Sequence, residues 1–230
     1  MNTKDFLTLV LVSLLWGGSF LFLRLLVLDG LEPLQIVSIR MILAALFIAP
    51  FFIRKMKKLS FYDHGFSFLL IGVLNTALPF TLFAYASVSL GAGSLSILQA
   101  TVPILTALIL FTLYKGEFSY FKLSGVMIGF AGLFLLVGPS GNLDLFASIL
   151  CVVASLSYAI AGVYLAKTPA RISNSFIGMG SIIVGAFLMA PFLLNYSNPF
   201  TTISAISWLY LALLGIVNTS LAYVIFIKLI

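Results

Sequence analysis

Two asparagines, Asn75 and Asn218, are the polar side chains whose positions most suggest a chemical role. Each lies near the middle of a long apolar segment, and the segments 72–87 and 215–230 are related in sequence at an offset of 143 residues. A primary amide exposed to lipid costs free energy, so each should face protein or a cavity. Two interpretations stay open. The amides could line one substrate site, or they could join helices by hydrogen bonds of about 0.6–2 kcal/mol each.

Four aromatic side chains with polar tips lie in the segments that the repeat relates, namely Trp16, Tyr85, Tyr158 and Tyr223. Such rings supply contact area to an organic ligand, and their polar tips orient it. We therefore take all four as candidate substrate-binding residues. The alternative is packing or a belt at the membrane surface, which suits Tyr85 best.

The segment 92–114 contains a proline that should disturb its helix. Pro103 cannot donate a backbone hydrogen bond to the carbonyl of Gln99, so a kink is expected there. The freed carbonyl beside Gln99 could point at a ligand. The alternative is a bend whose polar groups are satisfied by neighbouring helices.

Arg40 is a charged residue inside an apolar segment. It lies about seven residues after Pro33, hence roughly 10 Å deep, and has no acidic partner in its segment. It could bind a substrate carboxylate through two hydrogen bonds. It could instead satisfy helix-end carbonyls while reaching the membrane surface, and this structural role is favoured. Arg24 is expected to reach toward Asp29 or Glu32.

The composition excludes most classes of soluble protein. Hydrophobic residues make up 62% of the chain and charged residues 8%, against about a quarter charged in ordinary soluble domains. The net charge of +6 is spread over short clusters without a continuous basic face, which argues against nucleic acid. One cysteine and one histidine exclude an internal disulfide and a Cys- or His-based metal site, and no cofactor is expected.

Eight apolar segments are long enough to cross a membrane as helices. They are 6–28, 33–53, 65–86, 92–114, 121–138, 144–166, 174–194 and 206–228. Ten of the twelve Lys and Arg residues fall on one side of this arrangement, which places the N-terminus in the cytoplasm. The sequence therefore predicts an all-α polytopic membrane protein with eight transmembrane helices.

The repeat divides the chain into residues 1–138, with five helices, and 144–230, with three. Because five is odd, the second copy is expected to be inverted relative to the first. Transporters with inverted repeats place substrate near the bilayer midplane, where the repeats meet, and alternate access by rocking one half on the other. The acidic residues all fall at segment ends or in loops, so no proton-carrying acid is expected within the membrane.

Several short motifs, in order along the chain, resemble the drug/metabolite transporter superfamily, in particular its EamA-type members. They are Trp16-Gly17-Gly18-Ser19-Phe20, Pro33, Arg40, the run 72–85, and the block from Pro103 through Gly116-Glu117 to Gly129. Ser19, in the first motif, joins the candidate substrate-binding residues. The resemblance implies ten helices in two inverted five-helix repeats, and transport of small metabolites, often export of amino acids or related compounds. The second repeat lacks the last two of these helices, so a fragment or a truncated product is expected.

The expected function is alternating-access transport of small organic metabolites, amino acids or related compounds, with export favoured. The expected partners are a small-molecule substrate and the lipid bilayer, without nucleic acid, and a homodimer is left open. The plasma membrane, in bacteria the inner membrane, is the expected location. One alternative is a non-transporting truncated scaffold.

The other alternative is an intramembrane serine protease, suggested by Gly138-Pro139-Ser140-Gly141. Ser140 and the single histidine, His64, are expected at opposite membrane faces, about 30 Å apart. A nucleophile and its base must lie within hydrogen-bond reach. We therefore expect no enzyme activity.

Overall fold

The computed structural model describes residues 3–56, 65–113, 120–137, 144–167, 174–196, 200 and 203–226. In these ranges every regular element is a helix, which confirms the predicted all-α class. Seven described segments are long and apolar enough to cross a membrane. These are Thr3–Leu28, Pro33–Arg54, Gly65–Ala86, Ala92–Leu113, Leu145–Lys167, Phe176–Asn195 and Ala205–Phe226. The eighth expected segment, 121–138, corresponds to the helix Tyr120–Val137.

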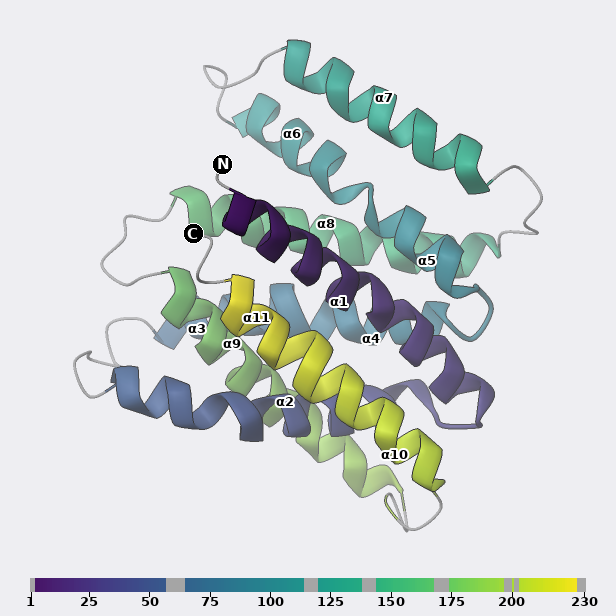
Figure 1. Cartoon of the computed structure of the whole chain (residues 1–230), viewed down its shortest axis with the longest axis vertical. Helices are drawn as coiled ribbons and strands as arrows, with labels where there is room; N and C mark the ends of the chain where they lie inside the picture. Colours follow the sequence, from purple (N-terminus) through teal and green to yellow (C-terminus); the bar gives the residue numbers. More distant parts are fainter. Residues whose placement is uncertain are drawn as a thin grey trace.

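Four spans consist of a single uninterrupted helix or nearly so (Figure 1). They contain α1 (Thr3–Leu28), α2 (Pro33–Met56), α8 (Leu145–Lys167) and α9 (Asn174–Met189), the last continued by the 3-10 helix η2 (Ala190–Asn195). In Figure 1, α6 (Val102–Leu113) and α7 (Tyr120–Val137) lie at one edge, while α2 and α9 cross in the opposite half. The two ends of the described chain run side by side, since α1 packs against the last span.

The third and the last spans both change to a π-helix in their middle. The third consists of α3 (Gly65–Gly72), η1 (Val73–Ala77) and α4 (Leu78–Ala86). The last consists of α10 (Ala205–Ala212), η3 (Leu213–Leu221) and α11 (Ala222–Phe226). Wide turns of this kind occur often at functional sites. Both π-helices carry the repeated Asn-Thr pair, so the repeat is visible in the backbone as well as in the sequence.

The fourth span is interrupted as the position of Pro103 predicted. It divides into α5 (Ala92–Gln99) and α6 (Val102–Leu113). The Leu98 carbonyl, left at the break, accepts hydrogen bonds from Thr101 Oγ1 at 2.6 Å and from Ser155 Oγ of α8 at 3.1 Å. A neighbouring helix therefore satisfies a backbone carbonyl at this bend, and the role of the Gln99 carbonyl stays a prediction.

Two glycines related by the repeat allow close approach between the N-terminal half (residues 1–138) and the C-terminal half (residues 144–230). A Cβ at Gly72 would lie 2.6 Å from Cγ1 of Val184 on α9. A Cβ at Gly215 would lie 2.7 Å from the Arg40 carbonyl on α2. Each glycine thus holds its span against the second helix of the opposite half, and a methyl group at either position would push the helices apart.

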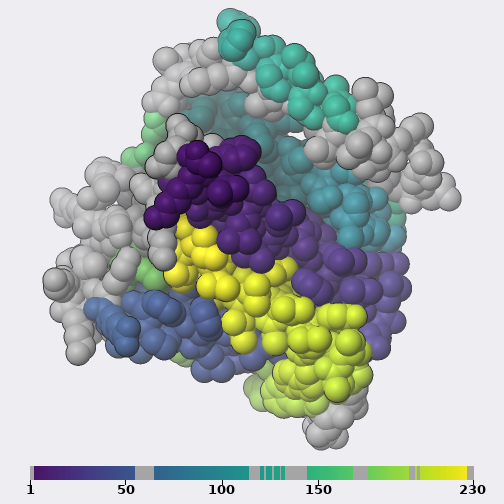
Figure 2. Space-filling view, viewed as in Figure 1, coloured from purple at the N-terminus to yellow at the C-terminus, as the bar shows by residue number. Residues whose placement is uncertain are grey.

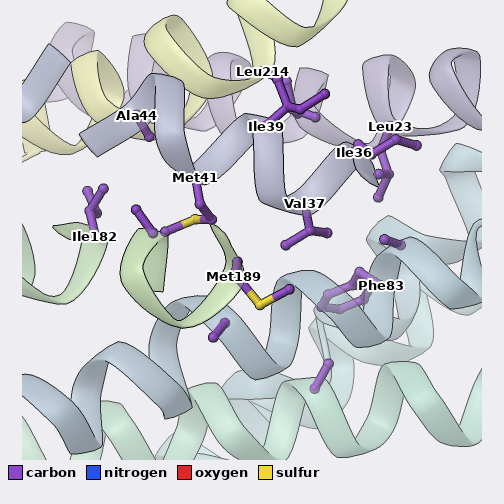
Figure 3. Close-up of a cluster of buried hydrophobic side chains, with 14 of the residues drawn as sticks. Leu23, Ile36, Val37, Ile39, Met41, Ala44, Phe83, Ile182, Met189 and Leu214 are labelled. Atoms are coloured by element: carbon purple, nitrogen blue, oxygen red, sulfur yellow. The ribbon is translucent and has the colours of Figure 1, made fainter. Parts of the chain in front are cut away.

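The interior of the bundle is built around α2. Its buried side chains include Ile36 and Ile39, which lie beside Leu23 and Leu214 in Figure 3. By contrast, α1 exposes many of its apolar side chains along the face seen in Figure 2, where it lies beside the last span. This distribution places residues 40 to 44 of α2 deep in the protein, where a charged side chain needs a specific partner.

Candidate substrate site

Arg40 turns into the bundle, and its partner comes from the other half of the chain. Its side chain is buried at 6% exposure, and Nε donates a hydrogen bond to Thr219 Oγ1 at 3.0 Å. The guanidinium carbon lies 3.7 Å from the centroid of the Phe80 ring, within the range of a cation–π contact. The expectation that Arg40 reaches helix-end carbonyls and the membrane surface was wrong, because η3 presents a hydroxyl acceptor inside the protein.

The π-helix η3 positions both residues of the second Asn-Thr pair. The Thr219 hydroxyl donates to the Leu214 carbonyl at 2.8 Å, which fixes its oxygen as the acceptor for Arg40. Asn218 is 3% exposed, and its Nδ2 has no hydrogen-bond partner. A Cβ at Gly18 would lie 3.5 Å from this nitrogen, so the backbone of α1 passes close to the amide. A buried unsatisfied donor costs about 1–3 kcal/mol, which calls for an explanation.

Tyr158 of α8 completes the surroundings of Arg40. The two side chains are close enough to interact electrostatically. The Tyr158 ring stacks on Phe83 with centroids 6.4 Å apart, and Phe20 meets Phe83 edge-on at 5.2 Å. An aromatic row therefore runs from Phe20 on α1 through Phe83 on α4 to Tyr158 on α8. We call Arg40, Phe80, Tyr158, Asn218 and Thr219 the Arg40 site.

The other asparagine, Asn75, is half-buried on η1. Its neighbour Thr76 donates to the Gly72 carbonyl and lies 3.3 Å from the Ser181 carbonyl of α9. Since Nδ2 of Asn218 is unpartnered, it donates no bond to Asn75. That both amides face one substrate stays a prediction.

The remaining candidates lie in several places. Ser19 is buried on α1, and Gln99 is half-buried at the end of α5. Trp16 is 39% exposed and packs on Phe226, with ring centroids 5.1 Å apart. Tyr85 is 44% exposed at the end of α4, as its alternative interpretation at the membrane surface requires.

Tyr223 of α11 packs tightly against α9. A Cβ at Gly178 would lie 1.2 Å from the Tyr223 hydroxyl oxygen, so the ring fills the space that a side chain would need. This contact supports a packing role for Tyr223.

Two members of the Arg40 site, Phe80 and Thr219, were missed as candidates from the sequence. Thr219 recurs as Thr76 in the repeat, so the signal was present in the Asn-Thr pair. Phe80 corresponds at the same offset to Tyr223, which was chosen for its polar tip. The face of the Phe80 ring, and not a polar tip, is what meets the charge.

Polar contacts also join the two halves at the end of the bundle where α1 ends and α2 begins. Asp29 accepts hydrogen bonds from Ser204 at 3.0 Å and from Ser207, and Glu32 accepts one from Tyr196 at 3.0 Å. The bonds from Ser207 and Ser204 lower the pKa of Asp29. Burial, followed by the bond to Glu32, raises the pKa of Tyr196 to about 12.

Arg24 does not pair with these carboxylates. Its Nη1 donates to the carbonyls of Ser87 and Val88, the latter at 2.9 Å, just beyond the end of α4. The expectation that it reaches toward Asp29 or Glu32 was wrong, because the last carbonyls of a helix are unpaired and attract a cation. Arg24 therefore has the structural role once expected of Arg40.

The chemistry available at the Arg40 site is that of a guanidinium, an amide, hydroxyls and aromatic rings. No group of three His, Cys, Asp or Glu side chains that could hold a metal ion occurs in the ranges that the structure describes. Ser140 and His64, the pair considered for a protease, lie outside the described residues.

Comparison with known proteins places the chain among membrane transporters. The sequence pattern of the EamA-like transporter family matches residues 4–138. This chain belongs to the EamA-like transporter family. The assignment confirms the resemblance drawn from the sequence motifs, and the protein is a membrane transporter by family.

Similarity to other transporters extends over nearly the whole chain. An uncharacterized transporter of Archaeoglobus fulgidus is 31% identical over 93% of this chain and 76% of its own length. The uncharacterized transporter YoaV of Bacillus subtilis is 26% identical over 96% of this chain and 78% of its own length. A crystal structure at 14% identity superposes with a TM-score of 0.69, covering 100% of this chain and 80% of the other. At that identity the likeness is one of fold.

Proposed function

We propose that this EamA-like protein carries small organic metabolites, amino acids or related compounds, across the membrane by alternating access, with export favoured. One observation supports the proposal most strongly. The Arg40–Thr219 hydrogen bond joins the two halves deep in the protein, and Asn218, whose amide is unpartnered, precedes Thr219 on the same π-helix. A substrate bound there would contact both halves, which is where inverted-repeat transporters bind their substrates.

Such a site couples occupancy to movement. A ligand shifts a conformational equilibrium only by its difference in affinity for the two states. Groups from α2 and η3 lie together in the present arrangement, and rocking the halves would change their spacing. Binding strength would therefore differ between the two orientations of the transporter.

The hydrogen bonds of Asp29 and Glu32 are a second set of contacts that the movement of the two halves would change. Both carboxylates accept bonds from the C-terminal half at the end of the bundle where α1 meets α2. We propose that this end faces the outside of the plasma membrane, since the Lys and Arg residues cluster toward the other side in sequence. Opening toward the outside would then break these bonds.

Counterflow in liposomes tests the proposal. The purified chain is reconstituted, the liposomes are loaded with one amino acid at a time, and uptake of the labelled compound is followed. We expect saturable uptake of at least one compound, reduced in Asn218→Leu. Absence of uptake, with no compound raising the melting temperature of the folded protein, would support the non-transporting scaffold instead.

A further inference from the structure

We infer that the Arg40 site binds a metabolite through a carboxylate group, held by Arg40 and Asn218. This inference rests on the proposed function and names the chemistry of its substrate. It is carried by two unmet requirements, on α2 and on the π-helix bonded to it: a charge without a counter-charge and an amide donor without an acceptor.

The charge of Arg40 is not balanced by the protein around it. Its hydrogen-bond partner, Thr219, is neutral, and Phe80 covers one face of the guanidinium without neutralising it. The acidic residues of the described ranges, Asp5 apart, are Asp29, Glu32 and Asp144, and these lie at or beyond helix ends. A cation so deep in a membrane protein is costly unless it is paired, and the missing partner is an anion.

The terminal nitrogens of Arg40 are available to such an anion. Only Nε donates to a described residue. Across the described ranges, Asn218 Nδ2 is the one fully enclosed side-chain nitrogen or oxygen without a partner, and the Nη atoms of Arg40 are not fully enclosed in this way. Two Nη groups in one plane match the two oxygens of a carboxylate.

Asn218 supplies a further donor from the opposite half. It precedes Thr219 on η3, and Thr219 is bonded to Arg40, so the amide and the acceptor of Arg40 lie on one turn of the last span. A buried N–H group without a partner is stabilised by a hydrogen-bond acceptor, and a carboxylate oxygen is a strong acceptor because it is charged. The rings of Phe80 and Tyr158 border the charge and can contact the apolar part of the ligand.

The charge is present in one half alone, which gives the site a direction. At the offset of 143 residues, Asn218 corresponds to Asn75, but Arg40 corresponds to Ile183. A molecule with one anionic end therefore binds in a single orientation, carboxylate toward Arg40. A neutral symmetric ligand would gain nothing from this asymmetry.

Melting temperatures in detergent test the inference with matched probes. The purified full chain is titrated with common amino acids, acetate, benzoate and phenylacetate, each compared with its primary amide, and with chloride. We expect at least one acid to stabilise the protein and to bind about 10- to 100-fold more tightly than its amide, as for hydrogen bonds to a charged group. Equal binding of acid and amide would overturn the inference, and so would stabilisation by chloride to the same extent as by any acid, or no stabilisation by any acid.

Variants identify the residues responsible. Arg40→Gln and Asn218→Leu should each remove the preference for acid over amide, and Arg40→Lys should retain part of it. Arg24→Gln is the matched control, because it also removes an arginine from an apolar helix but should leave the preference intact. An unchanged preference for acid over amide in Asn218→Leu would contradict the assignment, and so would loss of this preference in Arg24→Gln. If Arg40→Gln fails to fold, the result for Asn218→Leu alone tests the assignment.

Flux separates this inference from the proposed function. Counterflow of amides at the rate of their acids would leave transport standing and overturn the carboxylate site. Acid-selective binding that depends on Arg40, without flux of any acid, would overturn the proposed transport function but would support the carboxylate site.

Discussion

Arg40 Nε donates a hydrogen bond to Thr219 Oγ1 at 3.0 Å, and this bond joins α2 to the π-helix of the last span. The two residues are 179 positions apart in the chain. The bond gives the buried guanidinium of Arg40 a neutral acceptor inside the protein and fixes its position against the last span. Because the bond joins the two halves, a change in their relative position would change its length.

Removing the hydroxyl of Thr219 should destabilise the protein. In Thr219→Val, Arg40 loses its acceptor while the shape of the side chain is retained. We expect the free energy of unfolding to fall by about 1.5–3 kcal/mol, as for a hydrogen bond to a charged group. Equilibrium unfolding in mixed detergent measures it. Thr81→Val is the matched control, since Thr81 donates to Ala77 within its own helical span. Equal stability of the two variants would contradict the assigned role of the bond.

Replacing Asn218 should behave in the opposite way. Its Nδ2 has no partner, so Asn218→Leu removes a buried unsatisfied donor. We expect unchanged or higher stability together with impaired transport. Thermal unfolding and counterflow on the same preparation make the comparison. A loss of stability with normal transport would show that the amide serves only to hold helices together.

Gly178 should not tolerate alanine. The added Cβ would lie 1.2 Å from the Tyr223 hydroxyl oxygen, so the Tyr223 ring would have to leave its place or α9 would have to move. Overpacking of this kind costs about 1–3 kcal/mol. Gly162→Ala is the control, because nothing lies within 4 Å of its added Cβ. That control should gain about 0.5–1 kcal/mol from the lower entropy of the unfolded chain. Equal melting temperatures for the two variants would refute the packing described here.

Features that depend on neighbouring residues could be predicted from the sequence, and features that depend on residues far apart in the chain could not. The helical spans and the break at Pro103 were predicted, because apolar length and a missing backbone donor act locally. The π-helices were not predicted. Pro79 comes shortly after η1, but the equivalent position after η3 is Ala222, so a proline does not mark both π-helices. The roles of Arg24 and Arg40 were both misjudged. Their partners, the end of α4 and Thr219, are set by packing between distant segments.

Acid should loosen the contact at Asp29. Hydrogen bonds from Ser207 and Ser204 lower its pKa below the ordinary value of 3.8. A carboxylate with a lowered folded-state pKa contributes stability above its unfolded pKa, and this contribution is lost as the pH falls through the folded value. In Asp29→Asn we therefore expect a weaker fall of the melting temperature below about pH 4 than in the parent chain. Melting curves between neutral and acidic pH measure this slope.

Asp144→Asn is the control for that measurement. The pKa of Asp144 is also lowered, chiefly by the backbone N–H of Ala147 in the first turn of α8 and next by the side chain of Ser89. Asp29 instead accepts its bonds from two serines of the C-terminal half. If the contact at Asp29 closes the outer end, Asp29→Asn should also change the rate of counterflow, and by more than Asp144→Asn. Identical rates in all three proteins would contradict that role.

Counterflow of a stabilising carboxylate through liposomes, compared among the parent chain, Arg40→Gln and Arg24→Gln, tests the central claim most directly. Both variants lose a membrane-embedded arginine, but only one loses the proposed ligand for substrate. The account predicts that Arg40→Gln lowers the initial rate about 10-fold or more at equal amounts of folded protein, while Arg24→Gln transports at a rate close to the parent. Parent-like transport by folded Arg40→Gln would contradict it.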